Sequence, residues 1–138
     1  MDSNVTKKIV STEKAPKAVG PYSQAVQYKN ILYMSGLLGL DKKTMKLVPG
    51  GAGPETKQIL SNLQAFLEDI NISLNNVVKT IIYLKNMDDY SKVSHMYEKS
   101  FPNLKHAKTI VPVPKLPLNA NVEIEAIIDC RLLIDNNE

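Results

Sequence analysis

Two glutamates near the end of the chain, Glu123 and Glu125, are the residues whose spacing first indicates chemistry. They lie two positions apart in the segment NVEIEAIID, so in a strand both side chains point to the same face. A partly buried carboxylate of this kind can hold a water molecule as a general base. The alternative is a solvated face that pairs with lysines on neighbouring strands, and composition alone favours this alternative by roughly two to one.

One lysine and three prolines precede these glutamates. Lys108 stands near the start of the segment HAKTIVPVPKLPLNANVEIEAIID, and the three prolines follow it within six residues of one another. Pro112 and Pro114 are two positions apart, so their missing N–H groups face one side, and that side of the strand cannot be hydrogen-bonded to a neighbour. The segment is therefore either an ordinary end of a sheet or half of an active site.

Two turn-like segments offer further candidates. Gly20 and Pro21 force a tight bend before Tyr22, whose phenol either packs on a neighbouring residue or stacks on a ligand at the mouth of a pocket. In SGLLGLD, Gly36 and Gly39 mark either a bulge or strand end, or a backbone that approaches a ligand closely. No Lys-Ser or Lys-Thr pair follows these glycines, so the segment is not a phosphate-binding loop.

The remaining reactive side chains exclude several classes of site. The single cysteine, Cys130, rules out an intrachain disulfide framework, and its place on a largely apolar strand indicates a core thiol. His95 and His106 are isolated, so no zinc spacing and no Ser-His-Asp or Cys-His arrangement can be read from the sequence. The net charge of +3 is spread over isolated lysines or pairs, which is typical of a solvated surface rather than of a nucleic-acid face.

Hydrophobic periodicity predicts the elements that must position these residues. Apolar residues recur at helical spacing from Glu55 onward, and again after Asp88 and Asp89, which are candidate helix caps. β-Branched and alternating segments predict strands, and a further strand between 31–36 and the first helix is expected without assigned residues. The predicted helices are 55–70 and 87–101, the predicted strands are 24–28, 31–36, 75–86, 108–113 and 121–133, and the connections include a hairpin turn at 29–30 and a loop at 47–55.

This order of elements predicts an α+β fold in which two helices pack on one face of a mixed sheet. The whole chain, 1–138, is expected to be one domain with short flexible ends at 1–6 and 135–138. Two helices cannot cover both faces of such a sheet, and the 75–86 strand is apolar on both sides. We therefore expect the uncovered face to meet another subunit.

The order and spacing of five segments resemble those of the reactive intermediate deaminases, the YjgF-type Rid family, also called liver perchloric-acid-soluble protein-like. The segments are KAPKAVGPYSQAV, SGLLGLD, LVPGG, NNVVKTIIYLKNMDDYSKV and NVEIEAI, and they run from about Lys8 to Ile128. The resemblance implies a homotrimer of the chorismate-mutase-like fold, with sites in clefts between subunits. It also implies hydrolysis of small 2-imino and 2-enamino acids, such as 2-iminobutyrate and 2-aminoacrylate, to 2-keto acids and ammonia, with no cofactor and no metal.

The same resemblance assigns roles to individual residues. Tyr22 would lie over the substrate, Ser35 and the Gly36 backbone would line the pocket, and Glu123 would position the attacking water. Active members of the family carry an arginine that clamps the substrate carboxylate, and here Lys108 stands at that position. Arginine grips a carboxylate with two parallel hydrogen bonds, whereas lysine offers a mobile point charge. The resemblance therefore implies a cleft in which Lys108 stands beside Glu123 and supports weakened deamination, which a change of Lys108 to arginine would raise.

Three functions stay open after this comparison. The first is a deaminase, the second is a Rid-like protein that binds small carboxylates and has lost the chemistry, and the third is an RNA-cleaving or RNA-binding protein. The third ranks last because no basic stripe with interleaved aromatics is present.

Besides Lys108, two lesser departures from the family pattern are Leu37, where the family commonly has glutamine, and Asn119, where it usually has glycine.

The location of the protein is also an expectation from sequence. The segment MDSNVTKKIV has no apolar stretch typical of a secretory signal, and the resemblance begins too early to leave room for a transit peptide. No apolar run approaches the roughly 18–20 residues that a membrane span needs. We expect a cytoplasmic protein with no membrane association.

Overall fold

Alternation of apolar and polar residues forms the strands, and the clearest case is β6, Val122–Asp129, whose even-numbered residues are buried and whose odd-numbered residues are partly exposed. The computed structural model describes residues 6–102 and 106–131. The other strands are β1 Lys8–Val10, β2 Ala25–Tyr28, β3 Ile31–Leu37, β4 Val77–Leu84 and β5 Ala107–Pro112. The helices are α1 Ala52–Asp69 and α2 Tyr90–Ser100, with 3-10 turns at Leu74–Asn76, Met87–Asp89 and Pro117–Asn119.

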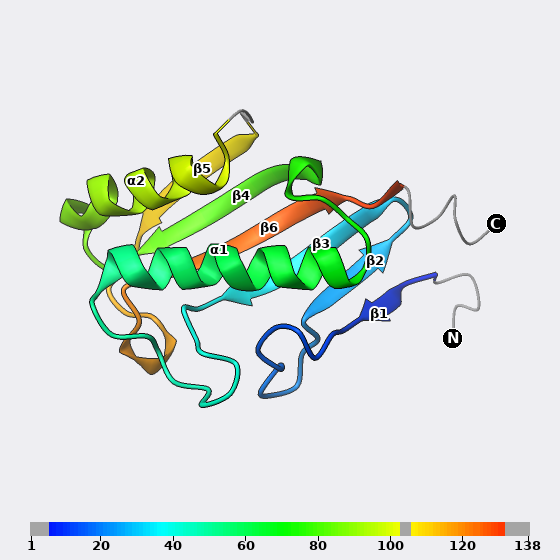
Figure 1. Ribbon diagram of the computed structural model, residues 1–138, viewed down its shortest axis with the longest axis horizontal. Helices are drawn as coiled ribbons and strands as arrows, with labels where there is room; N and C mark the ends of the chain where they lie inside the picture. The colour runs from blue at the N-terminus through cyan, green and yellow to red at the C-terminus, as the bar shows by residue number, and fades with distance from the viewer. Residues whose placement is uncertain (1–5, 103–105, 132–138) are drawn as a thin grey trace.

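The strands form one mixed sheet in the order β1-β2-β3-β6-β4-β5. Paired strands are antiparallel except β4 and β5, which are parallel because α2 crosses over between them. The last strand of the sequence, β6, is therefore central and is hydrogen-bonded to β3 on one edge and to β4 on the other (Figure 1). A strand paired on both edges holds its side chains at fixed positions on each face of the sheet.

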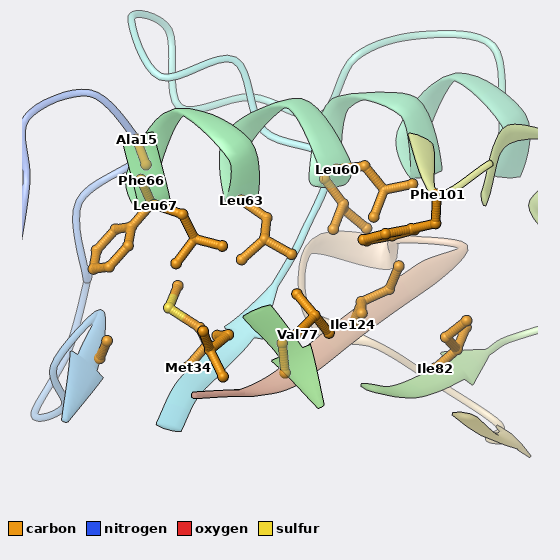
Figure 2. Packing of buried hydrophobic residues seen from close by; sticks show 14 of the residues in the cluster. Ala15, Met34, Leu60, Leu63, Phe66, Leu67, Val77, Ile82, Phe101 and Ile124 are labelled. Carbon is orange, nitrogen blue, oxygen red and sulfur yellow. The ribbon is translucent and has the colours of Figure 1, made fainter. Parts of the chain in front are cut away.

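Both helices pack on the same face of the sheet, as the sequence predicted (Figure 1). Side chains of α1 point down onto the strands, and Figure 2 shows this layer from close by. They include Leu60, Leu63, Phe66 and Leu67, none more than 2% exposed. Burying a side chain of this size is worth about 1.5–3 kcal/mol, so the stripe accounts for much of the free energy that holds α1 on the sheet.

The predicted helix boundaries need correction. α1 begins at Ala52 rather than at Glu55, because Pro54 is tolerated in a first turn, where an N–H group has no partner within the helix. The second predicted helix, 87–101, is a 3-10 turn followed by α2. Asp89 stands at the N-cap position of α2, but its side chain makes no capping hydrogen bond. The turn before α2 is capped by Asn86, whose side chain accepts a 2.9 Å hydrogen bond from the Asp88 backbone N–H.

The predicted strands shorten in a similar way. The 75–86 strand is Val77–Leu84, because Leu74–Asn76 forms a 3-10 turn. The 121–133 strand is Val122–Asp129, and positions 132 and 133 lie outside the described residues. The unassigned strand expected between 31–36 and the first helix is wrong, because that segment holds only an isolated bridge between Leu40 and Leu47. The third strand before α1 is instead β1, which the sequence did not predict and which pairs with β2. Except for Thr6, the ends predicted to be flexible also lie outside the described residues.

A buried carboxylate ties α1 to the start of β6. Glu55 is 2% exposed, and its two oxygens accept hydrogen bonds from the backbone N–H and the side-chain amide of Asn121, at 2.8 and 2.6 Å. Gly39 leaves room for this contact, because an added Cβ would stand 2.7 Å from the Cα of Glu55. The contact anchors the residue two positions before Glu123.

We expect Glu55→Ala to destabilise the fold by roughly 1.5–3 kcal/mol, because it leaves the Asn121 N–H without its charged acceptor. The midpoint of urea denaturation measures the change. Glu68→Ala, at an exposed position of the same helix, is the control and should shift stability by less than about 0.5 kcal/mol. Equal midpoints for the two variants would show that the Glu55 contact does not anchor β6.

The face of the sheet away from the helices carries apolar side chains that none of the described elements covers. Tyr33 is 47% exposed, and Ile81, Tyr83, Val111 and Ile127 are partly exposed. Their pairing partners place them on the side opposite to the buried positions of β4 and β6. None of the helices in the described part of the chain is long and apolar enough to cross a membrane.

Candidate active site

A bulge in β3 brings a glycine against a carboxylate of β6. The register between the two strands shifts between Met34 and Leu37, so Ser35 and Gly36 lie in the irregular part of the ladder. An added Cβ on Gly36 would stand 2.5 Å from Oε1 of Glu123, closer than real Cβ atoms approach another atom. The glycine is therefore required for the Glu123 carboxylate to occupy this position.

The environment of Glu123 disfavours the ionised form of its carboxyl group. Burial raises the pKa of its carboxyl group above the ordinary value of 4.5, and the charge of Glu125 raises it further. Both effects disfavour the ionised form, so the conjugate acid is a weaker acid and the carboxylate a stronger base than an exposed glutamate. The glutamate pair predicted from its spacing does share one face of β6.

The second member of that pair has a different contact. The phenol of Tyr83 donates a 2.5 Å hydrogen bond to Oε1 of Glu125, and this bond is the first cause of a raised Tyr83 pKa. One oxygen of Glu125 is therefore already used as an acceptor. This agrees with a structural role for Glu125 and leaves Glu123 as the carboxylate that faces Gly36.

The loop before β2 closes over the same place. The side-chain amide of Gln24 donates to the carbonyl oxygen of Pro16 at 2.7 Å, and its Oε1 accepts from the backbone N–H of Thr12 at 2.8 Å. Tyr22 folds back on this loop, where its hydroxyl oxygen accepts from the Val19 N–H at 3.4 Å. Tyr22 remains 54% exposed, as expected for a phenol at the mouth of a pocket.

Ser35 lies beside the loop and directs its hydroxyl hydrogen to the loop backbone. Its hydroxyl group donates a 2.6 Å hydrogen bond to the carbonyl oxygen of Ser23, and its backbone N–H donates to Gln24. The lone pairs of the Ser35 oxygen are then available to accept a further hydrogen bond.

These residues line one cavity of about 120 Å³. That volume is about four times a water molecule's share of the liquid, so it suits a small ligand. Tyr22, Ser35, Gly36 and Glu123 all contribute to its lining, so four of the five residues singled out from the sequence are brought together. Apolar walls come from residues of the core and the loop, including Met34, Leu37, Leu38 and Phe66.

The fifth residue, Lys108, is elsewhere within this chain. β4 lies between β5, which carries Lys108, and β6, which carries Glu123. Lys108 pairs with Thr80, whose buried side chain faces the helices, whereas Glu123 pairs with Tyr83 on the opposite face. The cleft in which Lys108 stands beside Glu123 is therefore absent from the described part of a single chain. Lys108 and Glu123 are separated because β4 lies between their strands and because their side chains lie on opposite faces of the sheet.

Lys108 instead lies over aromatic rings of α2. Its Nζ is 4.9 Å from the ring centroid of Tyr97 and 5.8 Å from that of Tyr90, within the range of cation–π attraction. The hydroxyl group of Tyr97 is hydrogen-bonded to Thr80 and to His106, and burial raises the Tyr97 pKa to about 12. Burial, and then the charge of Lys108, lower the pKa of His106. Sequence reasoning gave His106 no role, because nothing in the sequence showed that its ring lies against Tyr97 and Phe101 of the preceding helical segment.

The other departures noted in the sequence have structural explanations. Leu37 is partly buried and makes the cavity wall apolar. Asn119 adopts φ 57°, a conformation that asparagine accepts more readily than most residues, so it can stand where glycine is usual. The Val113 N–H bonds to Leu84 of β4, so Pro112 and Pro114 face the other, unpaired edge of β5, as predicted.

The arrangement can position a water molecule for attack on a small electrophile. It offers a carboxylate of raised pKa, a hydroxyl oxygen and a phenol at the mouth of an apolar cavity. Within residues 6–102 and 106–131, no group of three or more His, Cys, Asp or Glu side chains lies where it could hold a metal ion. Sequence reasoning missed Lys17 and Gln24, which also line the cavity, because no motif marks them.

Comparison with known proteins extends over nearly the whole chain. The family described as endoribonuclease L-PSP matches residues 12–130. A 2-iminobutanoate/2-iminopropanoate deaminase of Mus musculus is 45% identical over 125 residues, which cover 91% of this chain and 93% of the relative. The structure of the Rid protein YyfA from Yersinia pestis matches with a TM-score of 0.86 at 36% identity, covering 90% of this chain and 99% of that one. The structure of E. coli TdcF with bound serine matches with a TM-score of 0.83 at 26% identity, covering 88% and 98%.

Proposed function

This chain belongs to the Rid family, described as endoribonuclease L-PSP, and on that premise we propose that it hydrolyses small 2-imino acids to 2-keto acids and ammonia. The observation that carries the proposal is the Glu123 carboxylate, which lies against Gly36 in a cavity sized for a small ligand. The mouse relative bears the name of this activity, and the E. coli relative holds serine, a small molecule with an amino group and a carboxylate on one carbon.

The proposed reaction needs one water molecule and no cofactor. Glu123 accepts a proton from water as the water oxygen bonds to C2 of the protonated imine, and the electron pair of the C=N bond moves to nitrogen. The same proton then passes from Glu123 to nitrogen, which leaves as ammonia while Glu123 takes the proton of the C2 hydroxyl as the ketone forms. Glu123 then releases this proton to the departing ammonia or to solvent. An enamine such as 2-aminoacrylate enters the same route after protonation at its terminal carbon.

The other polar groups of the cavity fit this reaction. The Ser35 oxygen, whose hydrogen is directed to Ser23, can accept a hydrogen bond from the iminium N–H. Tyr22 at the mouth lies where it would cover a bound substrate. The apolar walls exclude bulk water, which strengthens the electrostatic effect of the carboxylate on the developing charge.

A coupled assay tests the proposal. An amino-acid oxidase converts 2-aminobutyrate to 2-iminobutyrate, and the imine is trapped by semicarbazide unless it is hydrolysed first. We expect the protein to lower the initial rate of semicarbazone formation in proportion to its concentration, because 2-oxobutyrate reacts with semicarbazide more slowly than the imine does. A protein that binds 2-oxobutyrate but leaves this rate unchanged would be a carboxylate-binding protein without the chemistry.

The acid limb of the pH–rate profile should reflect Glu123. Because burial raises its pKa above 4.5, kcat/KM should fall as pH falls through a value higher than that of an exposed glutamate. In Glu125→Gln the limb should move to lower pH, because the neighbouring charge that helps to raise the pKa is gone. An unmoved limb in that variant would indicate that another group sets the profile.

We also propose that the uncovered face of the sheet is buried in a homotrimer, as the resemblance to the family implies. A monomer would expose the apolar side chains of β3, β4 and β6 as one patch. Light scattering should give three times the chain mass of 15.3 kDa. Ile81→Asp, on this face, should dissociate the assembly, whereas Met87→Asp, next to α2, should not. A stable wild-type monomer would contradict the proposal.

A further inference from the structure

A tyrosine of β4 joins the two glutamates of β6. Tyr83 is the pairing partner of Glu123 where β4 and β6 lie side by side, so both side chains leave the sheet on the same face (Figure 1). The hydrogen bond of the phenol goes to the diagonal neighbour, Glu125, at 2.5 Å. A diagonal separation of roughly 7–8 Å is within the reach of an aromatic side chain. Tyr83 therefore lies beside one carboxylate and is bonded to the other.

This hydrogen bond favours one charge state of Glu125. A phenol donates more strongly to an ionised carboxylate than to a neutral carboxyl group, so the bond stabilises Glu125 as an anion. The tyrosine is coupled to both glutamates in return. Its pKa is raised first by the bond to Glu125, then by burial, and then by the charges of Glu125 and Glu123. Tyr83 therefore keeps its proton and remains a donor.

The other titratable groups that face this pair come from three elements of the chain. The ion pairs among residues 6–102 and 106–131 include neither Glu123 nor Glu125. With no ion pair to set the two carboxylates apart, the hydrogen bond of the tyrosine distinguishes them. The facing groups are Tyr83 and Lys79 of β4, Tyr33 of β3, and Lys17 and Tyr22 of the loop before β2.

We propose that Tyr83 is a positioning residue for the reaction: it holds Glu125 as an ionised neighbour and thereby makes Glu123 the member of the pair that accepts the proton. This rests on the function proposed above. Two carboxylates on one face of a strand can exchange roles, since either can hold a proton that the pair shares. Glu123 lines the cavity and Glu125 does not, so only a proton taken up by Glu123 can come from the attacking water.

Loss of the phenol hydroxyl group should change how the pair shares a proton. Burial, and then the charge of Glu125, raise the pKa of Glu123. Without the bond from Tyr83, a proton can reside on Glu125 instead. The neighbouring charge is then absent, so Glu123 stays ionised to lower pH. Because ionised Glu123 is the form that accepts the proton of water, the acid limb of the pH–rate profile should move to lower pH in Tyr83→Phe.

The experiment follows the titration of Glu123 directly and through activity. Carboxyl signals of the full-length protein are recorded by carbon-13 NMR against pH and assigned with Glu123→Gln and Glu125→Gln, and kcat/KM is measured over the same range. In Tyr83→Phe both the Glu123 titration and the acid limb should move to lower pH by roughly half a unit to one unit. Tyr33→Phe is the matched control and should move neither, because Tyr33 also lies on the uncovered face and lines a hollow with Glu125.

A double variant tests whether Tyr83 acts through Glu125. Tyr83→Phe combined with Glu125→Gln should give the same Glu123 titration as Glu125→Gln alone, because the hydroxyl group then has no carboxylate to hold. A further shift in the double variant, or an unmoved Glu123 titration in Tyr83→Phe, would overturn the proposal. If the NMR titration moves as expected but imine hydrolysis is not found, the role of Tyr83 in the pair stands and the proposed reaction fails.

Discussion

Replacing Glu123 by glutamine should lower kcat for imine hydrolysis by roughly 10²-fold or more, the usual contribution of a general base. Glutamine keeps the shape of the side chain beside Gly36 but cannot accept the proton of the attacking water. The oxidase-coupled assay, with semicarbazide as the trap, measures the loss. Glu125→Gln is the matched control on the same face of β6, and it should retain most of the activity because Glu125 already accepts from Tyr83.

The same substitution should not weaken the fold. The folded-state pKa of Glu123 is raised, so the folded chain holds its proton more tightly than the unfolded chain, and stability is lost as pH rises through the folded pKa. Glutamine carries no charge and avoids this loss. Above that pKa the variant should therefore be at least as stable as the wild type by urea denaturation. Loss of activity together with a lower urea midpoint would contradict this expectation. A variant that is both active and stable would show that Glu123 is a surface residue with no part in the reaction.

Replacing Gly36 by alanine should reduce activity about as much as the loss of the carboxylate itself, by roughly 10²-fold. The new Cβ would stand 2.5 Å from Glu123 Oε1 and 2.9 Å from its Cδ, so one of the two groups must move. The carboxylate is the far end of a flexible side chain, and it can rotate away at small cost in stability. We expect loss of activity in a folded protein, measured by the coupled assay and by circular dichroism of the same preparation.

Two other glycines provide controls for this experiment. Gly53 lies in the first turn of α1, where an added Cβ has its nearest neighbour, the Cβ of Lys92, at 4.0 Å, so Gly53→Ala should keep activity and gain up to about 1 kcal/mol of stability. An added Cβ on Gly39 meets the backbone of Glu55 at 2.7 Å, and backbone cannot rotate away, so Gly39→Ala should destabilise the fold instead. Full activity in Gly36→Ala would show that the Glu123 carboxylate is not held where the reaction needs it.

The sequence by itself determined the features that depend on local geometry. Side chains alternate across a strand with period two, so the pattern of β6 showed that Glu123 and Glu125 share a face while Ile124 lies in the core. Helical spacing likewise predicted the buried stripe of α1. The missing N–H groups of Pro112 and Pro114 predicted the unpaired edge of β5. Each of these inferences needs no knowledge of the neighbouring elements.

Element boundaries were less well determined, because competing local contacts decide them. The side chain of Asn86 caps a 3-10 turn at Met87–Asp89, so the α-helix begins only at Tyr90. Pro54 permits helix in a segment that its glycines and prolines made resemble a loop. In both places the pattern of apolar residues predicted the right kind of element. A single hydrogen bond or the first turn of a helix then moved the boundary of that element by a few positions.

Only the tertiary structure decided which candidate residues meet. Strands close in sequence need not be adjacent in a sheet, and here β4 lies between the strands of Lys108 and Glu123. The bulge that brings Gly36 against Glu123 pairs residues far apart in the chain. Lys17 reaches the cavity because the Gln24 side chain anchors its loop. Strand order, register and loop anchoring depend on how the whole chain buries its apolar surface, and no local pattern of residue types records that outcome.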